Sequence, residues 1–169
     1  MPHKTAVRES LVPLIDYPHM PYWFSLQQAI TLLRIAEMDD EPPTPRLVLV
    51  FDEKYQLLGL LRPEDILRGL EPRFLTKAPS GGWPTADSSE LAALWNDPAA
   101  SKEAAGLPVK DFMVPVKATV RVDDSLTHAA SLMLAAGVPV LAAMEGNRVA
   151  GIVRLDDAYN AITAALTEG

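Results

Sequence analysis

Two short motifs place an aspartate three positions after an arginine, which itself follows a glycine by three. They span Gly59 to Asp65 and Gly151 to Asp157. A carboxylate can accept one hydrogen bond from each hydroxyl of a vicinal diol, and a guanidinium can hold a phosphate through two parallel N–H bonds. An acid in the first turn of a helix also stabilises the helix dipole, by about 0.3–1 kcal/mol. The motifs therefore fit either a ligand site or structural ion pairs.

The two arginines sharpen this choice. Arg62 and Arg154 stand where a serine or threonine would cap the following helix, and a guanidinium cannot accept the backbone N–H bond that such a cap makes. One explanation is that each arginine binds phosphate beside the free N–H groups of the helix. The other is an ion pair with Asp65, Asp157 or Glu64 that existed before a duplication. If the arginine neutralises the aspartate, we expect nucleotide affinity to be lost.

Residues that could carry catalysis are missing from the sequence. The chain has no cysteine, which excludes disulfides, Cys-ligated metals and thiol nucleophiles. Its three histidines, His3, His19 and His128, show no metal-ligand spacing. There is neither a glycine-rich phosphate loop nor a Gly-x-Ser-x-Gly elbow. We expect no enzyme activity, no metal and no required cofactor.

Composition and charge describe a globular chain with no affinity for nucleic acid. The 169 residues include 15 Lys and Arg against 22 Asp and Glu, a formal net charge of −7, whereas phosphate backbones require a positive surface. The apolar run Ala129–Met144 is shorter than the ~20 residues that span a bilayer, and predicts a buried helix followed by a buried strand. The first ten residues lack the apolar core of a secretory signal. We therefore expect a soluble, cytoplasmic protein without membrane contact.

The chain contains an internal duplication. Val7–Leu14 matches Val109–Val116, Ser25–Leu33 matches Ser125–Met133, and Leu47–Asp65 matches Pro139–Asp157. The third match has six identities in 19 positions, where chance gives about one. These identities are Val48/Val140, Leu49/Leu141, Glu53/Glu145, Gly59/Gly151, Arg62/Arg154 and Asp65/Asp157.

Each copy predicts a strand, a helix, two strands that form a hairpin, and a closing helix. Ser125 suits the N-cap of a helix whose apolar residues recur at helical spacing, and the first copy repeats this pattern after Ser25. The predicted hairpin strands are residues 47–51 with 56–61, and 138–143 with 148–153. The closing helices begin near Pro63 and Asp156.

A long connector separates the copies. Residues 78–85 are rich in turn-forming residues, and a helix is predicted from Ser88 or Ser89 through Trp95, ended or kinked at Pro98. A further short turn is predicted over residues 101–105. Trp83 and Trp95 either cover the core of the two copies or form a surface for a partner. The expected organisation is a first repeat at 1–76, a connector with a short helix at 77–106, and a second repeat at 107–169.

The second copy resembles a cystathionine β-synthase (CBS) domain, and the two copies together resemble a tandem CBS pair, or Bateman module. The resemblance lies in residues 109–129, in Val138-Pro-Val-Leu141 and in Gly151-Ile-Val-Arg-Leu-Asp-Asp157. It is weaker over residues 17–24 of the first copy. It implies a mixed α/β (α+β) fold of two β-α-β-β-α repeats related by a pseudo-two-fold axis.

The resemblance also implies regulation by an adenosine-containing ligand such as AMP, ADP, ATP or S-adenosylmethionine. Such pairs often form homodimers and signal occupancy to an enzyme or transporter. In the family motif the aspartate accepts hydrogen bonds from the two ribose hydroxyls. A Thr or Ser in that motif contacts phosphate, and arginine replaces it here. The loop before Val138, which normally helps to enclose adenine, is short. The ligand-binding residues implied are Gly59, Arg62, Asp65, Thr119, Val138, Pro139, Gly151, Arg154 and Asp157.

Two functions remain open at this stage. The first is a nucleotide sensor in which ligand in a cleft between the copies shifts the population of two packings. The second is a structural dimerisation module whose clefts no longer bind nucleotide, as the two arginines indicate.

Overall fold

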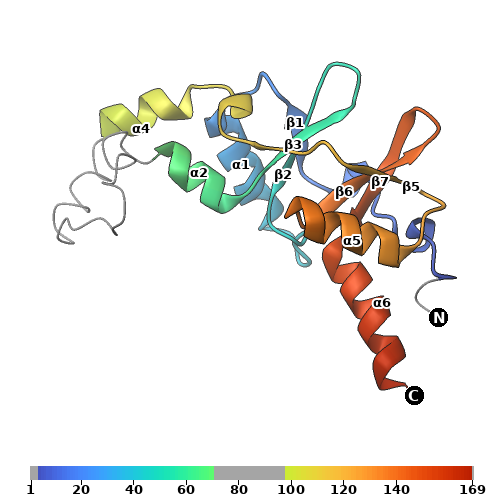
Figure 1. Ribbon diagram of the computed structural model, residues 1–169. Helices are drawn as coiled ribbons and strands as arrows, with labels where there is room; N and C mark the ends of the chain where they lie inside the picture. Colours follow the sequence, from blue (N-terminus) through green and yellow to red (C-terminus); the bar gives the residue numbers. More distant parts are fainter. Residues whose placement is uncertain (1–3, 71–97, 169) are drawn as a thin grey trace, which may run out of the picture.

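The two copies form two similar α/β units. The computed structural model describes residues 4–70 and 98–168. The first unit contains β1 (His19–Pro21), α1 (Leu26–Ala36), β2 (Val48–Phe51), β3 (Leu57–Leu61) and α2 (Pro63–Leu70). The second contains β5 (Thr119–Arg121), α5 (Leu126–Ala136), β6 (Val140–Glu145), β7 (Arg148–Arg154) and α6 (Leu155–Thr167). This order confirms the predicted β-α-β-β-α repeat (Figure 1).

Local sequence signals set the ends of the first helix in each unit. The Ser25 hydroxyl oxygen accepts the Gln28 backbone N–H at 3.2 Å, and the Ser125 hydroxyl oxygen accepts that of His128 at 3.1 Å. These are the N-cap bonds that the sequence predicts. Gly137 ends α5 in the left-handed region, with φ of 69°, where glycine is favoured. Within the described residues, no helix is both long and apolar enough to cross a membrane.

Each unit is built on a small mixed sheet. The first sheet has the order β1-β2-β3-β4, where β4 is Val114–Pro115, and the second has the order β5-β6-β7. In both sheets the first strand runs parallel to its neighbour and the hairpin strands are antiparallel. The start of the first two strands and the end of the third therefore lie at one edge of each sheet.

The two faces of β2 contribute to two separate hydrophobic clusters. Leu49 and Phe51 pack into one cluster with second-unit residues such as Leu141, whereas Val48 and Val50 face α1 in a second cluster. All four residues of β2 are buried, as expected for a strand covered on both faces. The larger cluster joins the two units.

The segments that precede each unit are exchanged. The Val7 N–H donates to the Asp124 carbonyl at 2.8 Å, and the Val109 N–H donates to that of Phe24 at 2.7 Å. Farther along the two segments, Val12 forms an antiparallel β-bridge with Ile152, and Val114 of β4 pairs with Leu60 of β3. The matched segments 7–14 and 109–116 thus occupy equivalent places, each packed on the unit that is more distant in the sequence. The matched bonds confirm the pseudo-two-fold relation.

The strand register corrects one detail of the sequence alignment. His19 pairs with Leu49, and its counterpart Thr119 pairs with Ala142, so Leu49 corresponds to Ala142 rather than to Leu141. The matched identities Val48/Val140 and Leu49/Leu141 are therefore not structural counterparts. The cause is one additional residue in the β2–β3 loop, since β3 and β7 follow the predicted alignment again.

The end of the connector forms α4 (Pro98–Ala105), which packs on α2 and contacts α1. The short turn predicted over residues 101–105 lies within α4, and whether a preceding helix is ended or kinked at Pro98 lies outside the described residues. The helix predicted from Ser88 or Ser89, and the roles suggested for Trp83 and Trp95, lie outside the described residues.

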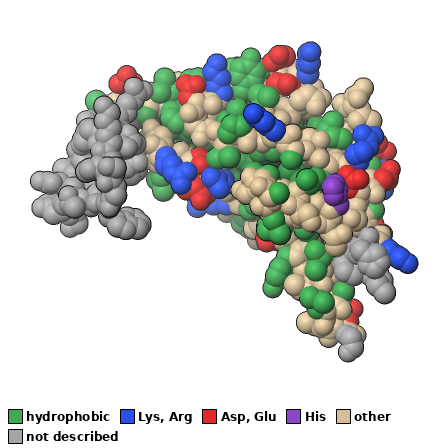
Figure 2. All heavy atoms as spheres, viewed as in Figure 1, with side chains coloured by type: hydrophobic (Ala, Val, Ile, Leu, Met, Phe, Trp, Pro, Cys, Tyr) green, Lys and Arg blue, Asp and Glu red, His purple; other side chains and the backbone are tan. Residues whose placement is uncertain are grey.

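At the opposite end, α6 extends beyond the core (Figure 1). Tyr159 and Leu166 on α6 are 63% and 78% exposed. Figure 2 shows hydrophobic side chains on this projecting part of the molecule.

Candidate ligand-binding site

The first motif forms a closed ion pair at the start of α2. Arg62 Nε and Nη2 donate to the two Asp65 carboxylate oxygens at 3.0 and 3.1 Å, and the Arg62 backbone N–H donates to the same carboxylate at 2.9 Å. Arg68 adds a fourth contact, at 3.4 Å. The hydrogen bond that Arg62 donates to Asp65 raises the pKa of Arg62. Asp65 is only 4% exposed, so its carboxylate is enclosed by these donors.

The second motif repeats the ion pair at the start of α6. Arg154 Nε and Nη2 donate to the Asp157 carboxylate at 2.8 and 3.0 Å, and this bond raises the pKa of Arg154. Arg154 Nη1 also donates to the Thr44 carbonyl at 2.9 Å, which ties this motif to the first unit. As expected, the arginine makes no side-chain cap to α6.

The structural alternative for the arginines is therefore observed at both motifs. The two aspartates nevertheless differ, since the Asp157 side chain is 22% exposed and the Asp65 side chain 3%. Asp157 accepts two side-chain bonds from Arg154, whereas Asp65 accepts from two arginines and a backbone N–H. Asp157 is the carboxylate that a ligand can reach with less rearrangement.

Gly59 and Gly151 have a structural role in the exchange of segments. A Cβ on Gly59 would lie 2.7 Å from the Val114 carbonyl oxygen, and one on Gly151 would lie 2.6 Å from that of Val12. Only a residue without a side chain allows the exchanged segment to approach so closely. The repeated glycines are thus explained by packing of the backbone, whether or not a ligand also contacts them.

The other residues implied by the resemblance lie at the same edge of the second sheet or beside it. Thr119 begins β5 and is exposed. Val138 is buried, and its N–H donates to the Met133 carbonyl at 3.0 Å. The Pro139 carbonyl accepts the Leu155 N–H at 2.8 Å, which places Pro139 next to the start of α6. The fold therefore brings Pro139 close to the second motif.

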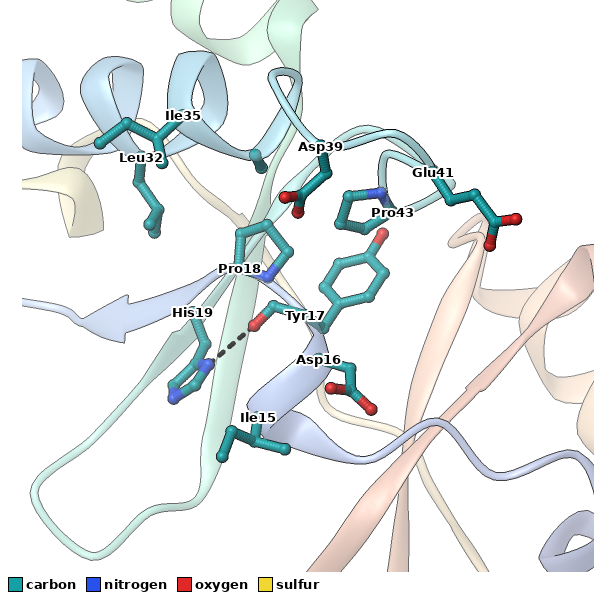
Figure 3. Close-up of a pocket in the computed structure, with 11 residues that line it drawn as sticks. Ile15, Asp16, Tyr17, Pro18, His19, Leu32, Ile35, Asp39, Glu41 and Pro43 are labelled. Atoms are coloured by element: carbon teal, nitrogen blue, oxygen red, sulfur yellow. Dashed lines mark hydrogen bonds between the residues drawn. The ribbon is translucent and has the colours of Figure 1, made fainter.

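Two adjoining cavities open on the first unit. The larger, of about 520 Å³, is bounded by α1 (Leu32, Ile35), by Tyr17–His19 and by the loop after α1 (Figure 3). The smaller, of about 290 Å³, shares Pro18, Ala36 and Pro43 with it. Thr44, whose carbonyl accepts the bond from Arg154, is one of the residues that line the smaller cavity.

The larger cavity combines apolar walls with acidic groups. Asp16, Asp39 and Glu41 line it. Tyr17 is buried, its hydroxyl donates to the Pro45 carbonyl, and burial raises its pKa. This lining suits a flat apolar ring with polar edges better than a chain of phosphates, because the carboxylates repel anions.

The sequence did not reveal the role of Tyr17, Thr44 or the cavity. Residues 39–45 belong to the loop after α1. Its contact with Arg154 joins residues that are 110 positions apart.

Comparisons with known proteins agree with this architecture. Residues 109–164 match the family model of the CBS domain. A search among curated proteins finds no match to the sequence.

Three solved structures illustrate the fold. A CBS domain-containing protein of unknown function from Kribbella flavida has a TM-score of 0.66 at 16% identity, covering 95% of this chain and 99% of that one. CBSX2, a CBS-pair protein known from Arabidopsis thaliana, has in its complex with AMP a TM-score of 0.59 at 21% identity, with coverage of 96% and 97%. The cytosolic domain of the Mg²⁺ channel MgtE, in complex with ATP, has a TM-score of 0.60 at 23% identity and covers 93% of this chain.

The chain spans about half of the MgtE structure, 48% of its length, and nearly all of the other two. The family match covers the second unit, and the three structural matches cover 93–96% of the chain. The chain accordingly has the fold of a tandem CBS pair, and its second repeat is a member of the CBS domain family.

Proposed function

We propose that this chain is a regulatory module that binds an adenosine-containing ligand and signals its presence to a partner enzyme or transporter. The ligand candidates are AMP, ADP, ATP and S-adenosylmethionine, and the proposed form is a cytoplasmic homodimer. The observation that supports this most directly is the shared fold with CBSX2 bound to AMP and MgtE bound to ATP.

The geometry favours a site between the second motif and the first-unit cavities. Asp157 is the more exposed of the two aspartates, and its partner Arg154 reaches the wall of the smaller cavity through Thr44. We infer that the adenine enters the apolar part of the larger cavity and that the ribose hydroxyls approach Asp157. The other implied residues, Thr119, Val138, Pro139 and Gly151, would border this site, and Gly59, Arg62 and Asp65 would border its counterpart.

The proposed signal passes through Arg154. This side chain binds Asp157 of its own unit and the Thr44 carbonyl of the other unit. A diol that competes for Asp157 would release the guanidinium from that carboxylate. Because Arg154 bridges the units, its new position would favour a different packing of one unit on the other, which a partner can detect.

A thermal-shift screen with the four ligands tests the proposal. A ligand present at 100 times its dissociation constant stabilises the folded state by about 2.7 kcal/mol, which raises Tm by about 5–10 °C for a chain of this size. We expect at least one of the four to produce such a rise. If none does, the sensor proposal fails.

The second candidate function is a structural module that has lost nucleotide binding. The observation in its favour is that both aspartates are already neutralised by arginines. Under this alternative, Arg154→Ser should free Asp157 and create nucleotide binding that the native chain lacks. Arg148→Ser, at the exposed far end of β7, provides a control with the same change in charge.

A further inference from the structure

A separate cavity of about 240 Å³ lies beside the β2–β3 hairpin of the first unit. Four of its residues are aromatic or heteroaromatic and two are acidic. The ring residues are His19, Trp23, Phe51 and Tyr55, and the acids are Asp52 and Glu53. His19 also lines the larger cavity, so the two cavities share one wall.

Three of the rings form a continuous aromatic wall. The Phe51 and Tyr55 rings are tilted by 33° with centroids 5.5 Å apart, and His19 stands edge-on to Phe51 at 6.0 Å. His19 Nδ1 lies 2.8 Å from the Tyr17 carbonyl oxygen, which can only accept, so Nδ1 carries a proton. In the neutral ring Nε2 then accepts from the Tyr55 hydroxyl, 3.4 Å away. The wall is held by specific contacts.

Tyr55 adopts an unfavourable backbone conformation at this site. Its φ is 62°, a region that bulky side chains rarely enter, and its side chain remains 57% exposed. Burial therefore does not account for a tyrosine here. The Tyr55 N–H donates to the Asp52 carbonyl at 3.1 Å, so the hairpin turn holds Tyr55 in this conformation.

The second unit provides an internal control. At the positions equivalent to His19, Trp23, Phe51 and Tyr55, it has no aromatic residue. These counterparts are Thr119, Asp123, Met144 and Asn147. The duplicated scaffold folds without the rings, so the fold itself does not require them in the first unit.

The equivalent place in the second unit already holds a cation. Arg8 Nη2 lies 3.4 Å from Asp123 and 3.3 Å from Glu145, the counterparts of Trp23 and Asp52. In the first unit the residue equivalent to Arg8 is Lys110. Its ammonium lies over the Tyr22 ring, 5.8 Å from the centroid, and Lys110 is not part of the cavity lining.

We propose that this cavity binds a small alkylammonium cation. Aromatic faces attract cations, and a methylated ammonium loses little hydration when it enters a ring-lined cavity. Asp52 and Glu53 supply the negative charge. Asp52 Oδ1 already accepts the Lys54 and Gln56 N–H groups at 2.8 and 2.9 Å, which holds the acid at the edge of the hairpin loop. This proposal does not depend on nucleotide binding.

The test compares three molecules of similar skeleton: choline, the neutral isostere 3,3-dimethylbutan-1-ol, and the primary amine ethanolamine. The chain has three tryptophans, so ¹⁵N-labelled indole signals can be assigned by substitution. We expect choline to shift the Trp23 signal saturably. The isostere and ethanolamine should bind at least about tenfold more weakly. Equal binding of choline and the isostere, or no saturable shift with choline, would overturn the proposal.

Variants then locate the site by calorimetry. Trp23→Leu should weaken choline binding about tenfold or more, and Trp23→Phe, which retains a ring, should weaken it by only a few-fold. Tyr159→Leu is the matched control, because it removes a similarly exposed ring outside the cavity. Unchanged affinity in Trp23→Leu, or equal loss in Tyr159→Leu, would contradict the assignment.

Discussion

Each of the two motifs holds its aspartate through a neighbouring arginine, but the two carboxylates are not equally constrained. Asp65 is buried and accepts from Arg62 and Arg68, whereas Asp157 is partly exposed and, among the side chains that the structure describes, accepts only from Arg154. Hydrogen bonds to charged groups stabilise proteins more when water is excluded. At the scale of single residues, the Asp65 carboxylate is therefore suited to stabilising the fold, and the Asp157 carboxylate to exchanging Arg154 for another hydrogen-bond donor.

This difference predicts unequal effects of truncation on stability. We expect Asp65→Ala to lower the free energy of unfolding by about 2–3 kcal/mol, because it removes the buried carboxylate that accepts from Arg62 and Arg68. Asp157→Ala should cost about 1 kcal/mol or less. Urea denaturation of both variants measures the difference, and equal losses would show that burial does not distinguish the motifs.

Because Tyr17 is buried, we expect the stability of the folded protein to decrease at alkaline pH. Burial raises its pKa in the folded state, whereas the unfolded chain ionises at its usual value of about 10. The stabilisation is thus complete below pH 10. Above that pH the unfolded state releases a proton that the folded state retains, so stability falls by up to about 1.4 kcal/mol per pH unit.

Tyr17→Phe should remove this contribution. Urea unfolding at pH 8 and pH 11 should show a larger loss in the native protein than in the variant. Other groups that titrate in this range are the same in both proteins, so their effects cancel in the comparison. If both proteins lose equal stability, Tyr17 is not held in its neutral form by the fold.

At the scale of elements, the exchanged segments explain the repeated glycines. Gly59 and Gly151 each face a backbone carbonyl of the crossing segment, at 2.7 and 2.6 Å from the position of a Cβ. We expect Gly59→Ala and Gly151→Ala each to destabilise the fold by about 1–3 kcal/mol, since a backbone atom cannot move aside easily.

Gly106→Ala is the matched control for these substitutions. Among the described residues, the nearest atom to its added Cβ would be the Glu103 carbonyl oxygen at 3.6 Å, an ordinary contact distance, so stability should change by no more than about 0.5 kcal/mol. Thermal or urea unfolding compares the three variants. Comparable stability in all of them would mean that the crossing segments are not closely packed on the hairpins.

The repeat made most elements predictable from the sequence. Ser25 and Ser125 define helix starts through a local bond, and the hairpin strands follow from apolar runs that are bounded by turns. The exchange of residues 7–14 was not predictable, because a local pattern does not specify which sheet a segment joins. The register of β2 was also predicted wrongly. One additional residue in the β2–β3 loop shifts the alignment of β2 by one position, and the hydrophobic pattern of the strand does not reveal this shift.

The candidate site was predictable only in its motifs. The spacing of the two motifs indicated both arginine–aspartate ion pairs, which were one of the two interpretations of the arginines. The other interpretation was phosphate binding. The contact of Arg154 with Thr44 and the position of Tyr17 depend on how the units pack on each other. The aromatic cavity was equally hidden, because its rings come from β1, the loop that follows it, and the β2–β3 hairpin.

At the scale of the whole molecule, the two units are joined by a shared core, by exchanged segments and by the bond from Arg154 to Thr44. A ligand at Asp157 would therefore act on the contact between the units rather than on one unit alone. The carboxylates of the larger cavity and the net charge of −7 favour a ligand with few phosphates, so AMP serves as the reference ligand.

Calorimetric titration of AMP into the native chain, Asp157→Ala and Asp156→Ala tests the account most directly. Asp156 is an exposed neighbour in the same helical turn, so its removal matches the loss of charge without breaking the bond to Arg154. We predict that the native chain and Asp156→Ala bind AMP with similar affinity and that Asp157→Ala binds at least about tenfold more weakly. Equal binding by all three proteins, or no binding by the native chain, would contradict the account.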